Sequence, residues 1–254
     1  MQIDVKKASW GRVRDNALVL FVATDGDARK RVRSLGKGLA DGWRSVLANK
    51  AFTGKRGQVE VLRQAPDARV PLLIVVGVGA GEPADVQAAA GRAVRRARTA
   101  GAQSVSLGVE ILGSARRQSA AALAQAQVEG AVLGLYRFLA WKAEQERPEV
   151  DQITLLAAEK DVRRVQRAAT QAQIVADGVC LARDLGNEPG NKATPLHLAE
   201  IGRELAHEHP TLTCEVLDEP TMRELGMGAL LGVGQASAEP SRMVILTHRP
   251  SKAK

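Results

Sequence analysis

Three sets of residues are of types that proteins use for chemistry. The segment VGVGAGEP (76–83) begins like a glycine-rich dinucleotide-binding turn, but Glu82 stands where the third glycine of that motif is needed. No acidic residue ends a second strand about 20 residues further on, as ribose binding requires. This mismatch favours a tight turn between a strand and a helix.

The second set consists of two histidines and the third of two cysteines. His207 and His209, in HEHP, lie two residues apart, which places them on different faces of a helix and makes joint zinc ligation unfavourable. They are expected to be solvated residues at the carboxyl end of a helix. Cys180 and Cys214 have no neighbouring base in the sequence, and Cys180 falls on an apolar helical stripe, which predicts a small buried residue.

Bulk properties narrow the class of protein further. The two cysteines give no disulfide framework, which fits a reducing, cytoplasmic environment. No stretch reaches the roughly 18 apolar residues that span a bilayer, so no membrane partner is expected. The first residues, MQIDVKKASWGR, lack the apolar segment of a secretory signal. Aromatic residues make up only 3%, so the core must consist mostly of Ala, Val and Leu.

Strand and helix signals alternate along the chain and predict an α/β fold. Strands are expected at 16–23, 58–64, 71–79, 104–111, 152–158, 213–217 and 242–248. Helices are expected around 35–47 and at 84–100, 117–142, 161–185, 195–207 and 219–225, with Gly101 as a helix stop, a turn cluster at 24–27 and a charged linker at 142–151. The expected architecture is a mixed, largely parallel amino-terminal sheet with helices on both faces, a long connector helix, and the beginning of a second α/β domain.

One segment carries a specific family motif. LARDLGNEPGNKATPLHLAE (181–200) closely resembles the junction motif of the leucyl (cytosol) aminopeptidase family, with Arg183, Asp184, Asn187, Pro189, Asn191 and Pro195 matching it. The two asparagines can satisfy their own backbone in a loop, and the two prolines fix φ and start the next helix. Such a loop is expected to dock a connector helix against the next domain.

The resemblance extends beyond the junction. Residues 216–246, which include LGMGALLGVGQASAEP, are similar to part of the family's catalytic domain. They are expected to form loop-rich segments that precede the sheet of that domain. EGAVLGLYRF (129–138) and the VGVG segment are weaker matches. The resemblance implies an amino-terminal α/β domain over 1–160, a connector helix over 161–186, and the start of a metallopeptidase catalytic domain over 187–254.

The family resemblance also implies a chemistry. Family members release amino-terminal residues from peptides with two divalent metal ions, Mn²⁺ or Zn²⁺, and assemble as homo-hexamers. Their metal ligands and catalytic residues lie in GKG-x-x-FD-[ST]-GG and NTDAEGR motifs, neither of which occurs here. No residue of this sequence can therefore be assigned a catalytic, cofactor-binding or metal-binding role. The chain alone is expected to hold no metal and to be inactive.

The distribution of charge supports a second hypothesis about function. Residues 1–150 contain 24 Lys/Arg and 14 Asp/Glu, a net charge of +10, whereas the rest of the chain carries a net charge of −2. A basic surface on one domain fits a non-catalytic module that binds nucleic acid, or simply a solvated face. A third hypothesis is that the chain is a natural, inactive truncation that associates with full-length subunits.

Overall fold

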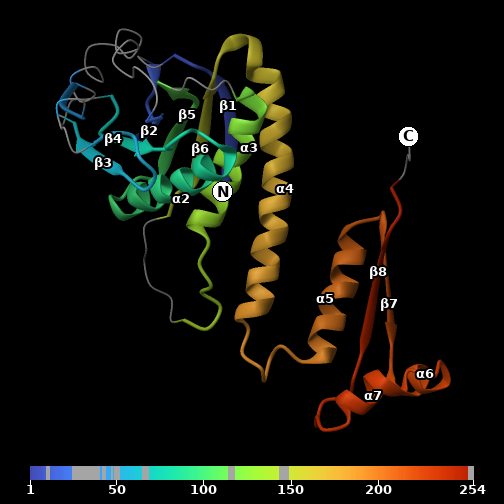
Figure 1. Ribbon diagram of the computed structural model, residues 1–254. Helices are drawn as coiled ribbons and strands as arrows, with labels where there is room; N and C mark the ends of the chain where they lie inside the picture. The colour runs from blue at the N-terminus through green and yellow to red at the C-terminus, as the bar shows by residue number, and fades with distance from the viewer. Residues whose placement is uncertain are drawn as a thin grey trace. The chain divides into compact units, whose positions relative to one another are not determined.

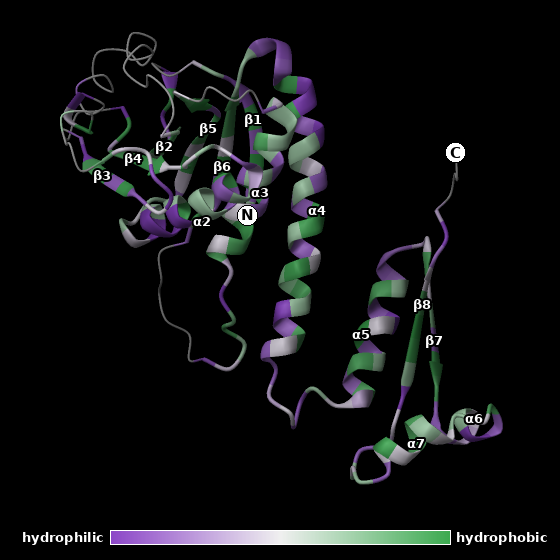
Figure 2. Ribbon diagram, viewed as in Figure 1, coloured by the Kyte–Doolittle hydropathy of each residue, from purple (hydrophilic) through white to green (hydrophobic). Residues whose placement is uncertain are grey.

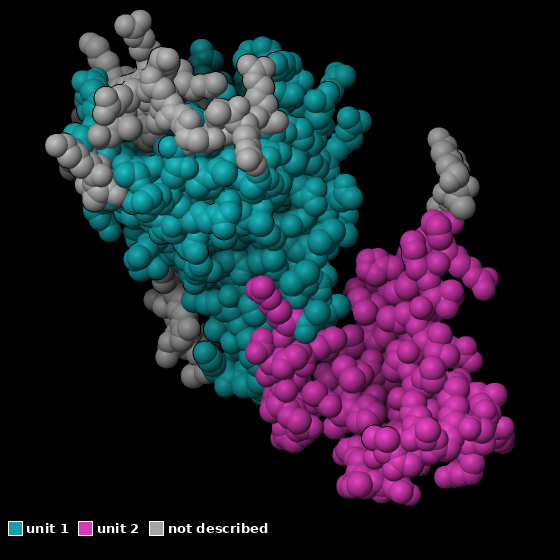
Figure 3. Space-filling view, viewed as in Figure 1, with its two compact units in different colours: residues 1–182 teal, residues 183–254 magenta. Residues whose placement is uncertain are grey.

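Figure 1 shows the computed structural model of the chain, which describes residues 1–9, 12–24, 41, 44–46, 48, 52–64, 69–113, 118–142 and 149–250. The chain forms two compact units, residues 1–182 and 183–254 (Figure 3). In the part of the chain described, no helix combines the length and apolarity needed to cross a bilayer.

The first unit is built on a six-stranded mixed sheet. The strand order is β1-β6-β5-β2-β4-β3. The strands are β1 (Gln2–Lys7), β2 (Ala17–Val22), β3 (Val59–Arg63), β4 (Leu72–Gly77), β5 (Ser104–Leu112) and β6 (Gln152–Ala157). All neighbours pair in parallel except β3, which pairs antiparallel with β4 at the edge. The sequence expectation of a mixed, largely parallel sheet is confirmed.

Three long helices cover one face of this sheet: α2 (Pro83–Thr99), α3 (Ala120–Leu135) and α4 (Val162–Asn187) (Figure 1). Because successive strand residues point to opposite faces, Val19 and Phe21 of β2 pack under the helices together with Ile74 of β4. The helices contribute mainly alanine and valine to this layer, such as Ala90 and Val165. This composition lets α2 and α3 pack closely, as the scarcity of aromatic residues implies.

The opposite face has a thinner cover. Leu18 and Leu20 of β2 and Leu73 of β4 pack there against Val46, from a short helical stretch, and Phe52. In Figure 2, the long helix α4 shows alternating hydrophilic and hydrophobic patches, as expected for a helix that buries one face only. Helical residues thus occur on both faces of the sheet, although the long helices share one of them.

The second unit contains α5 (Pro195–Glu208), β7 (Leu212–Leu217), α6 (Glu219–Glu224), α7 (Gly228–Gly234) and β8 (Met243–His248). The two strands pair antiparallel, with Leu212 opposite His248. The sequence predicted a largely parallel sheet for the amino-terminal domain and gave no direction for this second pair of strands. Two short helices return the chain to the end of β7, so β8 runs back along it.

Two elements were missed by the sequence analysis. Strand β1 carries only two partly buried apolar residues, Ile3 and Val5, because it lies at the sheet edge. Helix α7 falls in a stretch expected to be loop-rich, where its three glycines (Gly228, Gly232 and Gly234) weaken the helical signal.

One expected helix is too long. The helix predicted to run to residue 142 ends at Leu135. Arg98 on α2 donates a hydrogen bond to the Leu135 carbonyl at 3.0 Å, and Arg137 forms an ion pair with Glu149. These tertiary contacts satisfy the helix end and direct the chain away from the helical path.

Several expectations fall on residues that the structure does not describe. They are most of the helix around 35–47, residues 25–27 of the turn cluster and residues 143–148 of the linker.

Candidate functional site: the junction segment and the unit that follows it

The junction segment begins in the last turns of α4. The Asn187 side-chain amide donates to the Arg183 carbonyl at 2.8 Å, and the Glu188 backbone N–H donates to the Asp184 carbonyl at 3.1 Å. Asn187 therefore satisfies a backbone carbonyl at the carboxyl end of the helix, where the last four carbonyls lack intrahelical partners. The sequence predicted that Asn187 bonds to nearby backbone in a loop; it does bond to nearby backbone, but as the last residue of α4.

A tight turn follows. The backbone N–H groups of Lys192 and Ala193 donate to the Pro189 carbonyl at 2.8 and 3.0 Å, and Thr194 N–H donates to the Lys192 carbonyl at 2.7 Å. Asn191 is exposed and makes no side-chain hydrogen bond to another described residue, so the role expected for it is not observed. These backbone hydrogen bonds close the turn.

Helix α5 starts as the sequence predicted. Pro195 occupies its first turn, and the Thr194 hydroxyl accepts a hydrogen bond from the His197 N–H at 3.3 Å. The His197 imidazole also lies 3.7 Å from the Glu188 carboxylate. Two contacts therefore tie the first turn of α5 to the residues just before it.

Polar contacts within residues 216–246 hold the elements of this stretch together. Asp218 caps α6, accepting hydrogen bonds from the Thr221 hydroxyl at 2.7 Å and the Thr221 N–H at 3.0 Å. These bonds, with a smaller contribution from the positive charge of Arg242, lower the pKa of the Asp218 carboxyl below its usual 3.8. The Glu219 carboxylate accepts from the Ser241 N–H at 2.8 Å, which joins α6 to the start of β8.

The other sequence candidates are structural. Gly79 and Gly81 adopt positive φ in the turn between β4 and α2, which confirms the strand-to-helix turn. His207 lies in the last turn of α5 and His209 follows it, both exposed, as expected for solvated residues at a helix end. Cys180 is half-buried against the first unit's core rather than fully buried, because it sits near the end of the packed stretch of α4.

A metal site needs several ligand side chains close together. Within the described ranges, no group of three or more His, Cys, Asp or Glu side chains lies close enough to hold a metal ion. The described residues therefore do not fit a dimetal centre.

The class of protein follows from the comparison of the chain with known families. The profile of the cytosol aminopeptidase family N-terminal domain matches residues 19–145, and that of the family's catalytic domain matches residues 180–254. The chain belongs to the cytosol aminopeptidase family.

Individual relatives agree with this assignment. A probable cytosol aminopeptidase of Solibacter usitatus is 33% identical over 100% of this chain and 49% of its own length. The cytosol aminopeptidase of Pseudomonas aeruginosa is 31% identical over 99% of this chain and 52% of its own. The chain thus spans about half the length of the curated relatives it matches.

Solved structures share the fold. A variant of tomato leucine aminopeptidase superposes with a TM-score of 0.84 at 21% identity, covering 100% of this chain and 52% of that one. The bottromycin maturation enzyme BotP, in complex with Mn, gives a TM-score of 0.72 at 31% identity over 93% of this chain and 46% of its own.

A polar group on the first unit was missed by the sequence analysis. Ser106 and Thr154 are buried in β5 and β6, on the face opposite the long helices. The signal that could have found them is a single hydroxyl residue at a buried position of an otherwise apolar strand.

Proposed function

We propose that the whole protein is a metal-dependent aminopeptidase that releases amino-terminal residues, Leu among them, from peptides. The observation that carries the proposal is the 33% identity to a probable cytosol aminopeptidase along the entire chain. The aligned region includes the junction segment at 181–200, in which Asn187 and Thr194 form local hydrogen bonds.

In this proposal residues 1–160 form the amino-terminal domain, 161–186 the connector helix, and 187–254 the start of the catalytic domain. Burial supports the last assignment. Of the described residues from 183 to 250, only Ala199, Gly202, Leu217, Met222 and Ser241 are buried. Leu225, Leu230 and Val233 are exposed, the last at 85%. So small a core is marginal for an independent domain, which supports further chain covering this unit in the whole protein.

Two divalent metal ions, Mn²⁺ or Zn²⁺, are proposed as cofactors of the whole enzyme. The Mn-bound BotP structure supports manganese in particular. Paired cations of this kind polarise a peptide carbonyl and lower the pKa of a bound water. The residues described here do not supply such a site, so the 254-residue chain is proposed to be inactive alone.

The test compares two proteins. The 254-residue chain and the full-length gene product are assayed on Leu-p-nitroanilide with and without Mn²⁺. Hydrolysis by the full-length protein alone, increased by Mn²⁺, supports the proposal. No hydrolysis by either protein overturns the aminopeptidase function. Metal-dependent hydrolysis by the shorter chain would show instead that the catalytic residues lie within it.

Assembly and location complete the proposal. The family resemblance supports a cytoplasmic homo-hexamer for the whole protein. Light scattering coupled to size exclusion should give a mass six times that of one subunit for the full-length product. A monomeric, active full-length protein would contradict the hexamer.

The net charge of +10 on residues 1–150 favours nucleic acid as a second candidate partner. If this surface binds DNA, the affinity should fall steeply and linearly with the logarithm of the salt concentration. A gel-shift titration between low and physiological salt measures that slope. No shift at low salt would leave a solvated basic surface.

A further inference from the structure

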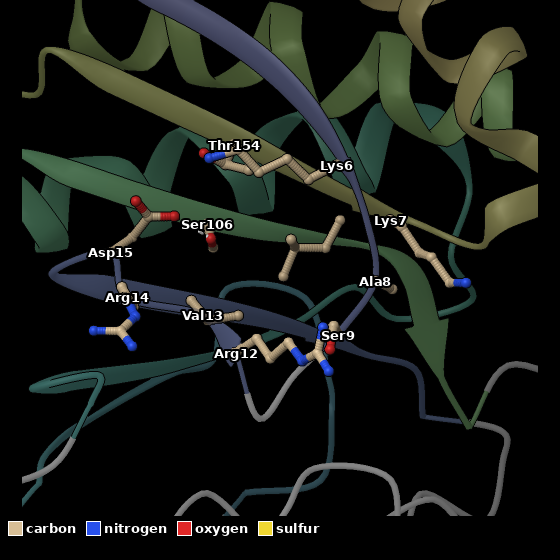
Figure 4. A pocket seen from close by; sticks show the side chains of 11 residues that line it. Lys6, Lys7, Ala8, Ser9, Arg12, Val13, Arg14, Asp15, Ser106 and Thr154 are labelled. Carbon is tan, nitrogen blue, oxygen red and sulfur yellow. Dashed lines mark hydrogen bonds between the residues drawn. The ribbon is translucent and has the colours of Figure 1, made fainter.

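A cavity of about 630 Å³ opens on the sheet face opposite the long helices, within the first unit. Its floor is formed by Ser106 of β5 together with Thr154 and Leu156 of β6, and its rim by residues 6–9 and 12–15. Figure 4 shows the Lys6 side chain extending over the strand that carries Thr154. The volume lies in the range of small-molecule sites, which is about 300–1,000 Å³.

The floor holds a polar group that the fold does not satisfy. The Thr154 side chain is 1% exposed, and its hydroxyl has no hydrogen-bond partner among the described residues. A buried hydroxyl is rarely left unpaired, since it has lost its hydrogen bonds to water. The neighbouring Ser106 hydroxyl, also buried, donates to the Asp15 carboxylate (Figure 4). Thr154 is therefore the free donor at the base of the cavity.

The charges around the cavity favour an anion. Lys6, Arg12 and Arg14 line it and form no ion pair with another described residue, whereas Lys7 is paired with Glu159 at 2.5 Å. Asp15 is the one carboxylate among the described lining residues, so Lys6, Arg12, Arg14 and Asp15 together carry a net charge of +2, with Lys7 neutralised by Glu159. A phosphate monoester carries a charge of about −1.5 to −2 at neutral pH and presents three acceptor oxygens.

We propose that this cavity binds a small phosphorylated molecule bearing hydroxyl groups, such as a sugar or polyol phosphate. The phosphate accepts from the Thr154 hydroxyl and from Lys6, Arg12 and Arg14, and a ligand hydroxyl donates to the Asp15 carboxylate. The Asp15 carboxylate repels a bare anion and can accept from a hydroxyl, which favours a polyol phosphate over inorganic phosphate. The site is separate from the peptidase function and does not depend on it.

The test is calorimetric titration of the full 254-residue chain with glycerol 3-phosphate, and with inorganic phosphate, at low ionic strength. Thr154→Val removes the free donor without changing the side-chain shape, and it should weaken binding about tenfold, the effect of one hydrogen bond to a charged group. Lys6→Gln and Arg12→Gln should each weaken binding several-fold. Arg92→Gln removes an exposed cation of α2 that is not part of the cavity, and it should leave binding unchanged.

Each outcome decides the question. Saturable binding of glycerol 3-phosphate that is lost in the cavity variants and kept in Arg92→Gln supports the site. No binding by the unaltered chain, or equal weakening by Arg92→Gln, overturns it. If Thr154→Val does not fold, Lys6→Gln and Arg12→Gln decide, because both side chains are exposed. Binding of an oligonucleotide in preference to glycerol 3-phosphate would also overturn the proposal.

Discussion

A Cβ atom placed on Gly134 of α3 would lie 2.5 Å from the Cα atom of Gly91 on α2. The two helices therefore meet backbone to backbone at this point. Gly130, one turn earlier on α3, faces the backbone of Gln87 in the same way. Glycine is needed here because of space, since neither helix has a positive φ at these positions.

Replacing Gly134 should destabilise the first unit. Gly134→Ala forces the α2 and α3 backbones apart, and overpacking of this kind costs about 1–3 kcal/mol, against about 0.5–1 kcal/mol gained in helix propensity. Urea unfolding monitored by circular dichroism measures the difference. Gly178→Ala on α4 is the matched control, because its Cβ would meet open space, and it should be neutral or stabilising. Equal effects of the two variants would contradict the close approach.

Gln127 should matter more than its neighbour Gln125 on the same helix. Gln127 is fully buried and donates to the Gly108 carbonyl of β5 at 2.8 Å, whereas Gln125 is exposed and contacts Glu129. Gln127→Ala removes that buried hydrogen bond and the packed side chain, and it should cost about 1–3 kcal/mol. Gln125→Ala should stay within about 0.5 kcal/mol. The same urea titration compares the two, and similar losses would argue against a specific role for the buried amide.

Thr194 should determine the stability of the first turn of α5. Thr194→Ala removes the hydroxyl that accepts from the His197 N–H and should cost about 1 kcal/mol, the usual effect of losing a helix cap. Hydrogen exchange of the α5 amides is the direct measurement. Thr194→Ser keeps an acceptor and should exchange like the unaltered chain. Unchanged exchange in Thr194→Ala would show that Pro195 alone sets the start of this helix.

Local patterns predicted most of the first unit. Wholly apolar runs identified β2 and β4, because strands buried on both faces carry no alternation. Gly101, with φ of 85°, ends its helix as its position suggested. The end of α3 was not predictable, since it is held by tertiary contacts with Arg98 and Glu149, which are distant in the sequence. Strand β1 was not predicted, because an edge strand buries few residues and its hydrophobic pattern is weak.

The candidate site was predictable only where a motif exists. The junction segment was found through its asparagines and prolines, and its local turn and capping bonds could be inferred from residue type. The Thr154 cavity could not, because it depends on the register that places β5 beside β6 with Ser106 opposite Thr154. The direction of β8 was also inaccessible, since a strand pattern is the same in both directions.

Acid should weaken the second unit through Asp218. The folded-state pKa of this carboxyl is lowered, chiefly by the hydrogen bonds from Thr221, so its contribution to stability is complete above the unfolded pKa of 3.8. That contribution is lost as the pH falls below 3.8 and through the lower folded value. An NMR titration of the Thr221 amide should give a midpoint below 3.8. In Asp218→Asn, which can still cap the helix but cannot titrate, this transition should disappear. A midpoint at or above 3.8 in the unaltered chain would mean that the cap does not hold the charged carboxylate in solution.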